Sequence, residues 1–207
     1  MPAPGPRRSS GLLRGPRAAA DGRVRRGERN RERILEALFE LIGEGRLHPT
    51  AEEVATRAGV GTRTVFRHFD DMERLYAEID ARTMELVRPL LAIQPPDGAL
   101  SMRVAALAER RAALYERVAP FMRSAFLQRG RSPFLRKRTA ETARNLRADL
   151  LRHLPELDDA PAWVADALET LTSFEAWDRL RREQRLGRER AQDTLRASTL
   201  ALIRSAR

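Results

Sequence analysis

The sequence contains no cysteine, which excludes disulfide bonds and thiolate metal sites. Lysine is almost absent as well, because Lys137 is its single occurrence, so arginine carries nearly all of the positive charge. The three histidines, His48, His68 and His153, lack the spacing of a metal-ligand pair. We therefore expect neither a metal nor any other cofactor.

Long apolar runs are also missing. The longest candidate, Leu86 to Ile93, is interrupted by Arg88 and Pro89 and is too short to cross a bilayer. The basic N-terminus lacks the apolar segment of a signal peptide, so we expect a cytoplasmic protein. The chain has no nucleophile elbow and no phosphate-binding loop, and these absences argue against an enzyme.

Positive charge is concentrated near the N-terminus. Residues 1–33 hold ten arginines against three acidic residues, and so carry +7 of the formal net charge of +10. Such a segment favours nucleic acid as a partner. Residues 1–24 are rich in Pro, Gly, Ser and Ala without apolar periodicity, which predicts a disordered arm. Either this region contacts DNA, through Arg23, Arg25 and Arg26, or it is a solvated tail.

Over the rest of the chain, apolar residues recur at helical spacing and alternating β-branched runs are absent. The predicted fold class is therefore all-α. A first helix is expected from about Arg26 to Gly43, and a fourth from Asp70 onward. The sequence Pro95-Pro96-Asp97-Gly98 is the clearest break, with helices on both sides.

Prolines and glycines set the expected boundaries of the later helices. Pro120 is predicted to open a short helix, and Ser132-Pro133 to cap and start the next. Pro161 is predicted to open a long helix that reaches about Arg185. Gly187 separates this helix from the last one.

The most informative segment is TAEEVATRAGVGTRTVFRHF, residues 50–69. Thr50 and Glu53 have the spacing of a capping box, which predicts a helix start. Ala55 is small where two helices would cross, and Gly59 supplies a residue tolerant of positive φ for the turn. These features indicate a helix-turn-helix, although an ordinary helical hairpin with an incidental glycine has the same spacing.

Residues 31–79 resemble the N-terminal domain of the tetracycline-repressor (TetR) family. The similarity rests on Ile34, Phe39, Thr50, Val54, Ala55, the sequences AGVG and TVFRHF, and Leu75. It implies three DNA-binding helices, a linking fourth helix, and a C-terminal domain for ligand binding and dimerisation. The chain then divides into a disordered basic arm over 1–24, a helix-turn-helix domain over 25–71 and a helical regulatory and dimerisation domain over 72–207.

The resemblance also indicates which side chains meet double-stranded DNA. The candidates are Thr50, Thr62, Arg63, Thr64, Phe66, Arg67 and His68. Base readout is expected from residues 62–64, since an arginine here can donate two hydrogen bonds to guanine. His68 is equally suited to a packing role beside Phe69. Phe66 could contact a thymine methyl or the sugar backbone, or fill the core.

By the same resemblance, a small apolar ligand binds in the C-terminal domain. The candidate ligand-binding residues are Met84, Met102, Tyr115, Phe121, Met122, Phe126 and Trp177, each of which also suits ordinary core packing. The implied function is a transcriptional repressor that its ligand releases from an operator. An effector-independent nucleoid-type protein, and a helical enzyme or carrier that kept this fold, are the alternatives.

A homodimer is expected because one short recognition helix covers too few base pairs for a useful site, whereas two read a palindrome. The last two helices are the expected interface. Their candidate contacts are Trp163, Leu168, Leu171, Leu180, Leu195, Thr199 and Leu202. The competing interpretation is that these residues close the core of the monomer.

Overall fold

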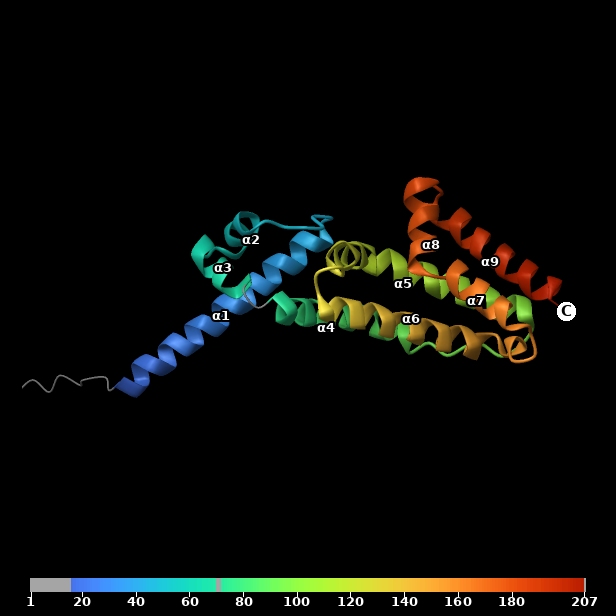
Figure 1. The fold of residues 1–207 in the computed structure, drawn as a ribbon, viewed down its shortest axis with the longest axis horizontal. Coiled ribbons are helices and arrows are strands. Elements are labelled where there is room, and N and C mark those ends of the chain that lie inside the picture. Colours follow the sequence, from blue (N-terminus) through green and yellow to red (C-terminus); the bar gives the residue numbers. More distant parts are fainter. Residues whose placement is uncertain (1–15, 70–71, 207) are drawn as a thin grey trace, which may run out of the picture.

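The computed structural model of the protein describes residues 16–69 and 72–206. In this part of the chain every regular element is helical, which confirms the all-α fold class (Figure 1). The elements are α1 (Pro16–Gly43), α2 (Ala51–Ala58), α3 (Thr62–Phe69), α4 (Met72–Leu91), α5 (Leu100–Gln128), α6 (Pro133–His153), η1 (Pro155–Leu157), α7 (Ala162–Leu171), α8 (Phe174–Asp178), η2 (Arg179–Glu183) and α9 (Arg188–Ser205). Helices α1–α3 form one end of an elongated molecule, α7–α9 form the other, and α4–α6 run between them.

Helices α1–α3 close on a core of branched and aromatic side chains. Ile34 of α1, Val54 of α2 and Val65 of α3 are fully buried in it. Phe121 of α5 completes this core, and its ring stacks on Phe39 with centroids 4.5 Å apart. Burying each such side chain contributes about 1.5–3 kcal/mol. The core of α1–α3 therefore depends on a residue from a helix that follows much later in the sequence.

Helix α2 is capped at both ends by the residues that the sequence predicts. The backbone N–H of Glu53 donates to Oγ1 of Thr50 at 3.2 Å, and the N–H of Thr50 donates to Oε2 of Glu53 at 2.8 Å, which completes the capping box. Gly59 ends α2 with a φ of 60°. A Cβ there would displace only Nη2 of Arg33, the end of a flexible exposed side chain, so the left-handed backbone is what requires glycine.

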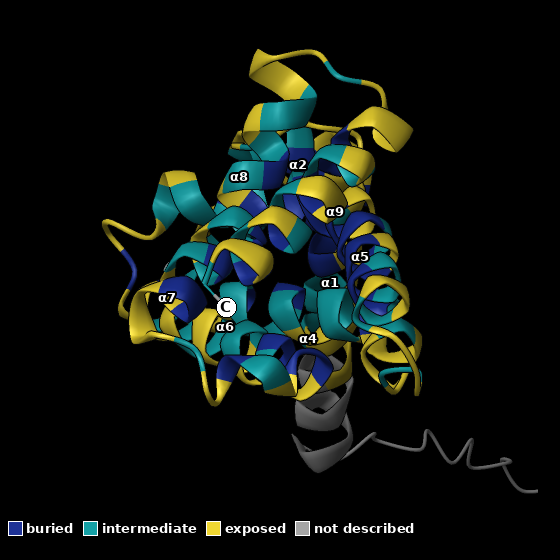
Figure 2. Ribbon diagram, turned by 90° about the vertical axis from the view of Figure 1, so that its right-hand side faces the viewer, coloured by how far each residue is buried: buried dark blue, intermediate teal, exposed yellow. Residues whose placement is uncertain are grey.

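Helix α5 joins the three cores of the molecule. Phe121 lies in the core of α1–α3, Val118 packs with Trp177 in a second core, and Leu107 packs with Leu150 in a third at the far end. Buried residues recur along α5 from Val104 to Ser124, and Figure 2 shows buried turns of this helix. The helix is thus one element shared by α1–α3 and the C-terminal helices.

A buried polar cluster lies between α5 and α6. Asp149 forms ion pairs with Arg110 and, at 3.2 Å, with Arg111. Nδ1 of His153 lies 2.9 Å from the backbone oxygen of Asp149, and Arg110 also donates to the oxygen of Ile93 at 3.0 Å. Two buried arginines therefore share one buried carboxylate, and the histidine beside them is held in a positive environment.

Helix α1 begins about ten residues before the start expected near Arg26. Residues 16–24 are helical, whereas the sequence predicted disorder through residue 24. Proline at the first helical position and the three alanines over 18–20 favour this earlier start. Residues 1–15 of the expected arm lie outside the described residues, as do Asp70 and Asp71, which were expected to open the fourth helix.

The prediction that Pro120 opens a helix is wrong, because Pro120 lies inside α5. A proline removes one backbone hydrogen bond and crowds the preceding turn, at about 3 kcal/mol. Its neighbours Val118, Ala119 and Phe121 are all buried. Their packing keeps the helix continuous through the proline.

The predicted long helix from Pro161 to Arg185 is also wrong. Helix α7 ends at Leu171, and Ser173 caps the short α8 by accepting a hydrogen bond from the N–H of Ala176 at 3.2 Å. The hydroxyl of Thr172 donates back to the oxygen of Leu168 at 2.7 Å. Two adjacent hydroxyl residues that bond to the backbone favour a helix boundary over a continuous helix. Among the described residues, no helix combines the length and hydrophobicity that a membrane span requires.

Candidate DNA-binding surface and ligand cavity

Helix α3 buries one side chain and exposes the opposite face. Val65 is fully buried, whereas Arg63, Phe66 and Arg67 are exposed, with 59% of Phe66 accessible. The half-buried residues at the edges of this face are Thr62, Thr64 and His68. Phe66 therefore does not fill the core, and of its suggested roles contact with DNA is the one compatible with its position.

The exposed arginines of α3 differ from the nearest arginine of α2. Arg57 donates to Glu44 at 2.8 Å and to Glu40 at 3.2 Å, which fastens α2 to α1. Neither Arg63 nor Arg67 forms an ion pair with any residue that the structure describes. Within the described residues their guanidinium groups have no carboxylate partner, whereas that of Arg57 is already engaged.

His68 lies at the inner edge of the recognition helix. Its Nε2 atom is buried and has no hydrogen-bond partner among the described residues. Burial, followed by the charges of Arg67 and Arg31, lowers the pKa of His68 below the ordinary histidine value. The ring is therefore neutral at pH 7 in the free protein, which supports the packing role over a permanent positive charge facing phosphate.

Thr50 is exposed, but its hydroxyl already serves the capping box. Oγ1 accepts from the N–H of Glu53 and lies 3.0 Å from Oε2 of the same residue. Hydrogen bonds from Thr50 also lower the pKa of Glu53, which keeps this carboxylate charged. The primary role of Thr50 in the free protein is to start α2, and a phosphate contact would be added to that role.

The first half of α1 projects from the end of the molecule that α1–α3 form (Figure 1). The first core residue of the helix is Ile34, and none of residues 25–33 is buried. Arg25, Arg26 and Arg29 are exposed along it. At 1.5 Å per residue, the segment 16–30, which we call the α1 spur, extends about 22 Å. Arg25, Arg26 and Arg29 are therefore presented on a helix.

The comparison with known families addresses this end of the molecule. Residues 34–79, from the middle of α1 to the middle of α4, match the model of the tetR family of bacterial regulatory proteins. The chain thus contains a TetR-family N-terminal domain. The matched segment contains the whole helix-turn-helix, so the chain is a DNA-binding transcriptional regulator. No curated protein shows a significant match to it.

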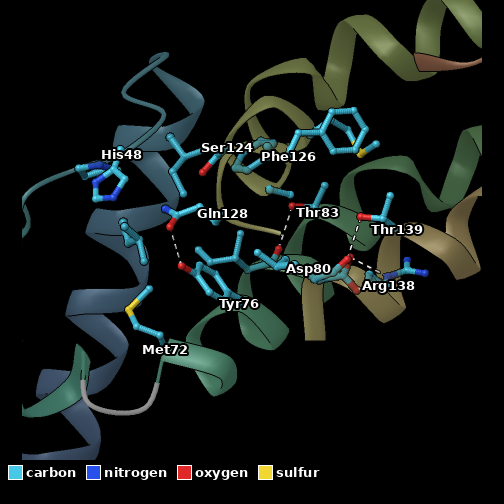
Figure 3. A pocket seen from close by; sticks show the side chains of 18 of the residues that line it. His48, Met72, Tyr76, Asp80, Thr83, Ser124, Phe126, Gln128, Arg138 and Thr139 are labelled. Atoms are coloured by element: carbon cyan, nitrogen blue, oxygen red, sulfur yellow. Dashed lines mark hydrogen bonds and ion pairs between the residues drawn. The ribbon is translucent and has the colours of Figure 1, made fainter. Parts of the chain in front are cut away.

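A cavity of about 300 Å³ lies where the TetR-family domain meets the helices that follow it (Figure 3). Leu38, Ile42 and Phe69 line it from the DNA-binding side, and Ile79 and Phe121 line it from α4 and α5. We call it the seam cavity. Its volume is at the lower end of the range of small-molecule sites, roughly 300–1,000 Å³.

Polar side chains face the seam cavity in two pairs. The hydroxyl of Tyr76 donates to Oε1 of Gln128 at 3.0 Å, and Nε of Arg138 donates to both oxygens of Asp80, at 2.8 and 2.7 Å. Burial, and then the charge of Glu73, raises the pKa of Tyr76, so its hydroxyl remains a neutral donor. The cavity is thus lined mainly by apolar side chains from α1 and α3, and by these polar pairs from α4, α5 and α6.

The seven residues predicted to bind ligand occupy different places. Phe121, Met122 and Phe126 line the seam cavity, and Met84 and Tyr115 line a neighbouring cavity of about 110 Å³, to which Met122 also belongs. By contrast, Met102 is 57% exposed at the start of α5, and Trp177 is buried in the second core. Those last two lie away from the seam cavity, so five candidates remain close to it.

Sequence reasoning missed the polar residues of the cavity, above all Asp80 and Arg138. They lie 58 positions apart, on helices whose charged residues look like ordinary solvated faces. The signal that could have found them is their position beside apolar residues that face the core. Asp80 directly follows Ile79 on α4, and Arg138 lies three residues after Leu135 on α6.

Helix α4 is fastened on both sides of the seam. Toward α1, Arg31 pairs with Glu78, and Arg82 pairs with both Glu32 and Glu36. Toward α6, Asp80 pairs with Arg138, and a carboxylate oxygen of Glu73 accepts from the backbone N–H of Phe134 at 2.8 Å. A displacement of α4 relative to α6 therefore alters contacts that reach α1.

Proposed function

We propose that the protein is a homodimeric repressor that a small molecule releases from a palindromic operator by binding in the seam cavity. The observation that carries this proposal is the composition of the cavity wall. Leu38, Ile42 and Phe69 belong to the DNA-binding domain, and the opposite wall belongs to α4–α6. A ligand between them contacts both parts at once.

The mechanism follows from differential binding. A ligand that prefers one placement of α1 and α3 relative to α4–α6 shifts the population toward that placement. In a dimer, the separation of the two recognition helices changes with it. A coupling of about 1–3 kcal/mol would weaken operator binding by roughly 5–150-fold.

The dimer interface is proposed on the outer faces of α7 and α9. Trp163 of α7 is 53% exposed, which is unusual for so large an apolar side chain, and Ala197 and Ala201 form an exposed strip of small residues on α9. Of the contacts expected from the sequence, Leu168, Leu195 and Thr199 are buried inside the monomer. The half-buried residues Leu171, Leu180 and Leu202 remain candidates at the edges.

The experiment that tests the proposal begins with DNA selected from a random pool by the full-length protein. We expect a two-fold symmetric site, bound by a dimer, whose affinity falls when an effector enters the seam cavity. Filling the cavity genetically with Thr83→Trp should mimic the effector and weaken operator binding. Binding without sequence preference would instead support the nucleoid-type alternative, and turnover of a bound compound without DNA binding would support an enzyme or carrier.

A further inference from the structure

The ion pair in the seam cavity leaves one of its partners with unused donors. Both oxygens of Asp80 accept from the same atom, Nε of Arg138. A guanidinium has five N–H donors, so this contact occupies only one of them. Nη2 of Arg138 lies 2.9 Å from Sδ of Met84, which is a weak acceptor, and Nη1 donates to no residue in the described part of the chain.

Arg138 borders open space. It lines both the seam cavity and the neighbouring cavity of about 110 Å³, and 20% of its side chain is accessible. Asp80 holds the guanidinium plane through Nε at the edge of the seam cavity (Figure 3). A donor pair oriented in advance binds a ligand at a smaller entropic cost.

We propose that the ligand of the seam cavity is a monocarboxylic acid with an apolar body, whose carboxylate is bound by the terminal nitrogens of Arg138. A carboxylate matches the planar fork of arginine with two parallel hydrogen bonds. The body would lie against Leu38, Ile42 and Phe69 on the DNA-binding side. The inference rests on the proposed function, because it names the chemical class of the proposed effector.

The surrounding charge favours an anion over a cation. Helix α6 carries six basic residues, Arg136, Lys137, Arg138, Arg144, Arg147 and Arg152, against Glu141 and Asp149. The oxygens of Asp80 are already engaged, whereas Nη2 of Arg138 meets only the weak acceptor Sδ of Met84 and Nη1 has no acceptor among the described residues. An ammonium group would have to compete for Asp80 beside a positive helix, while a carboxylate meets free donors there.

This site also suggests how the signal would travel. A carboxylate on the terminal nitrogens of Arg138 shares the positive charge of the guanidinium with Asp80, and so weakens the ion pair that links α6 to α4. Through Glu78, which pairs with Arg31, α4 is fastened to the helix that carries the DNA-binding core. The carboxylate of the ligand would thus loosen the contact of α4 with α6, while its apolar part moves the two sides of the seam cavity apart.

The test uses three probes with one ten-carbon body: decanoate, 1-decanol and decylamine, each titrated into the full-length protein by calorimetry. Decanoate should bind about tenfold or more tightly than the other two. Arg138→Gln should weaken decanoate binding roughly 10–100-fold and leave 1-decanol binding unchanged. Lys137→Gln removes the same charge from an exposed neighbour, with 78% of its side chain accessible, and should change neither.

A second variant separates ligand binding from folding. Asp80→Asn keeps an oxygen to orient Arg138 but removes the competing charge, so decanoate should bind more tightly to it than to the unchanged protein. Arg138→Gln and Asp80→Asn both break the same ion pair. If that pair were merely structural, the two substitutions would change the affinity for decanoate in the same direction. Opposite directions support the proposal, and a parallel weakening contradicts it.

The outcomes for this inference and for the proposed function are distinguishable. If 1-decanol or decylamine binds as tightly as decanoate and lowers operator affinity, effector release stands and the carboxylate inference is wrong. If decanoate binds through Arg138 but operator affinity is unchanged, the carboxylate site stands and effector release is wrong. If none of the three binds, the carboxylate inference is wrong, and Thr83→Trp still tests effector release separately.

Discussion

At the scale of single residues, the arginines of the helix-turn-helix have distinct roles that their partners define. Arg57 joins α2 to α1 through Glu40 and Glu44, whereas Arg63 and Arg67 point from the exposed face of α3. We therefore expect Arg63→Ala to relax specificity at one or two base pairs, at about 1–3 kcal/mol. Arg67→Ala should weaken binding to all sequences alike and lower the salt slope by about 1. Footprinting and salt titrations measure both.

Arg57→Ala is the matched control for these substitutions. It removes an equal charge from the same domain but from an arginine that is already paired, at a cost of about 0–1 kcal/mol in stability. Its operator preference should equal that of the unchanged protein. If Arg63→Ala also leaves the preference unchanged, Arg63 does not read bases.

The buried histidine gives a second residue-scale prediction. Burial and the charges of Arg110 and Arg111 lower the pKa of His153, against the opposing effect of Asp149. Because the unfolded chain then takes up the proton first, the neutral ring stabilises the fold above pH 6.5, and this contribution disappears as the pH falls below that value. The thermal midpoint should therefore fall between about pH 7 and about pH 5.

The control for this effect is His153→Asn, whose amide N–H can replace Nδ1 as donor to the oxygen of Asp149. The midpoint of this variant should vary less over the same range. Burial is outweighed by hydrogen bonds and by the nearby arginines, so the pKa of Asp149 is also lowered, but its carboxylate takes up a proton below pH 3.8 and does not interfere. Equal pH dependence in the two proteins would show that His153 does not titrate in this window.

At the scale of helices, the α1 spur makes the N-terminal charge an extended, ordered surface. Replacing Arg23, Arg25 and Arg26 with glutamine should reduce DNA affinity. It should also flatten the dependence of log K on log salt, by up to about 0.9 for each phosphate that the variant no longer neutralises. The core begins at Ile34, so the thermal midpoint should not change. An unchanged salt slope, measured by fluorescence anisotropy, would leave the spur with a role in solubility alone.

Helix boundaries also show what could be predicted from the sequence and what could not. Thr50, Glu53 and Gly59 act through local geometry, so their roles were readable from spacing. Pro120 could not be placed correctly, because the buried side chains around it belong to cores that only the folded chain assembles. For the same reason the pairing of Asp80 with Arg138, which joins two helices distant in sequence, left no local pattern.

At the scale of the whole molecule, the proposed dimer interface can be tested by substituting Trp163, a large apolar side chain that is exposed in the monomer. Trp163→Glu should convert the protein to monomers at micromolar concentration and abolish the preference for a palindrome over a half-site, with little effect on folding. Leu127→Glu, which introduces the same charge at a leucine 65% exposed near the other end of the bundle, should remain dimeric. Sedimentation equilibrium distinguishes them, and a dimeric Trp163→Glu protein would place the interface elsewhere.

The continuity of α5 bears on how such regulators can be recombined. Phe121 stacks on Phe39, and the hydroxyl of Ser124 donates to the oxygen of Leu47 at 2.8 Å, so the last turns of α5 belong physically to the DNA-reading module. A chimera that joins residues 1–91 of this protein to another sensor would leave that module without one wall. A functional exchange must carry the segment 118–128 along with the N-terminal helices, because the modules that can be exchanged are not contiguous in the sequence.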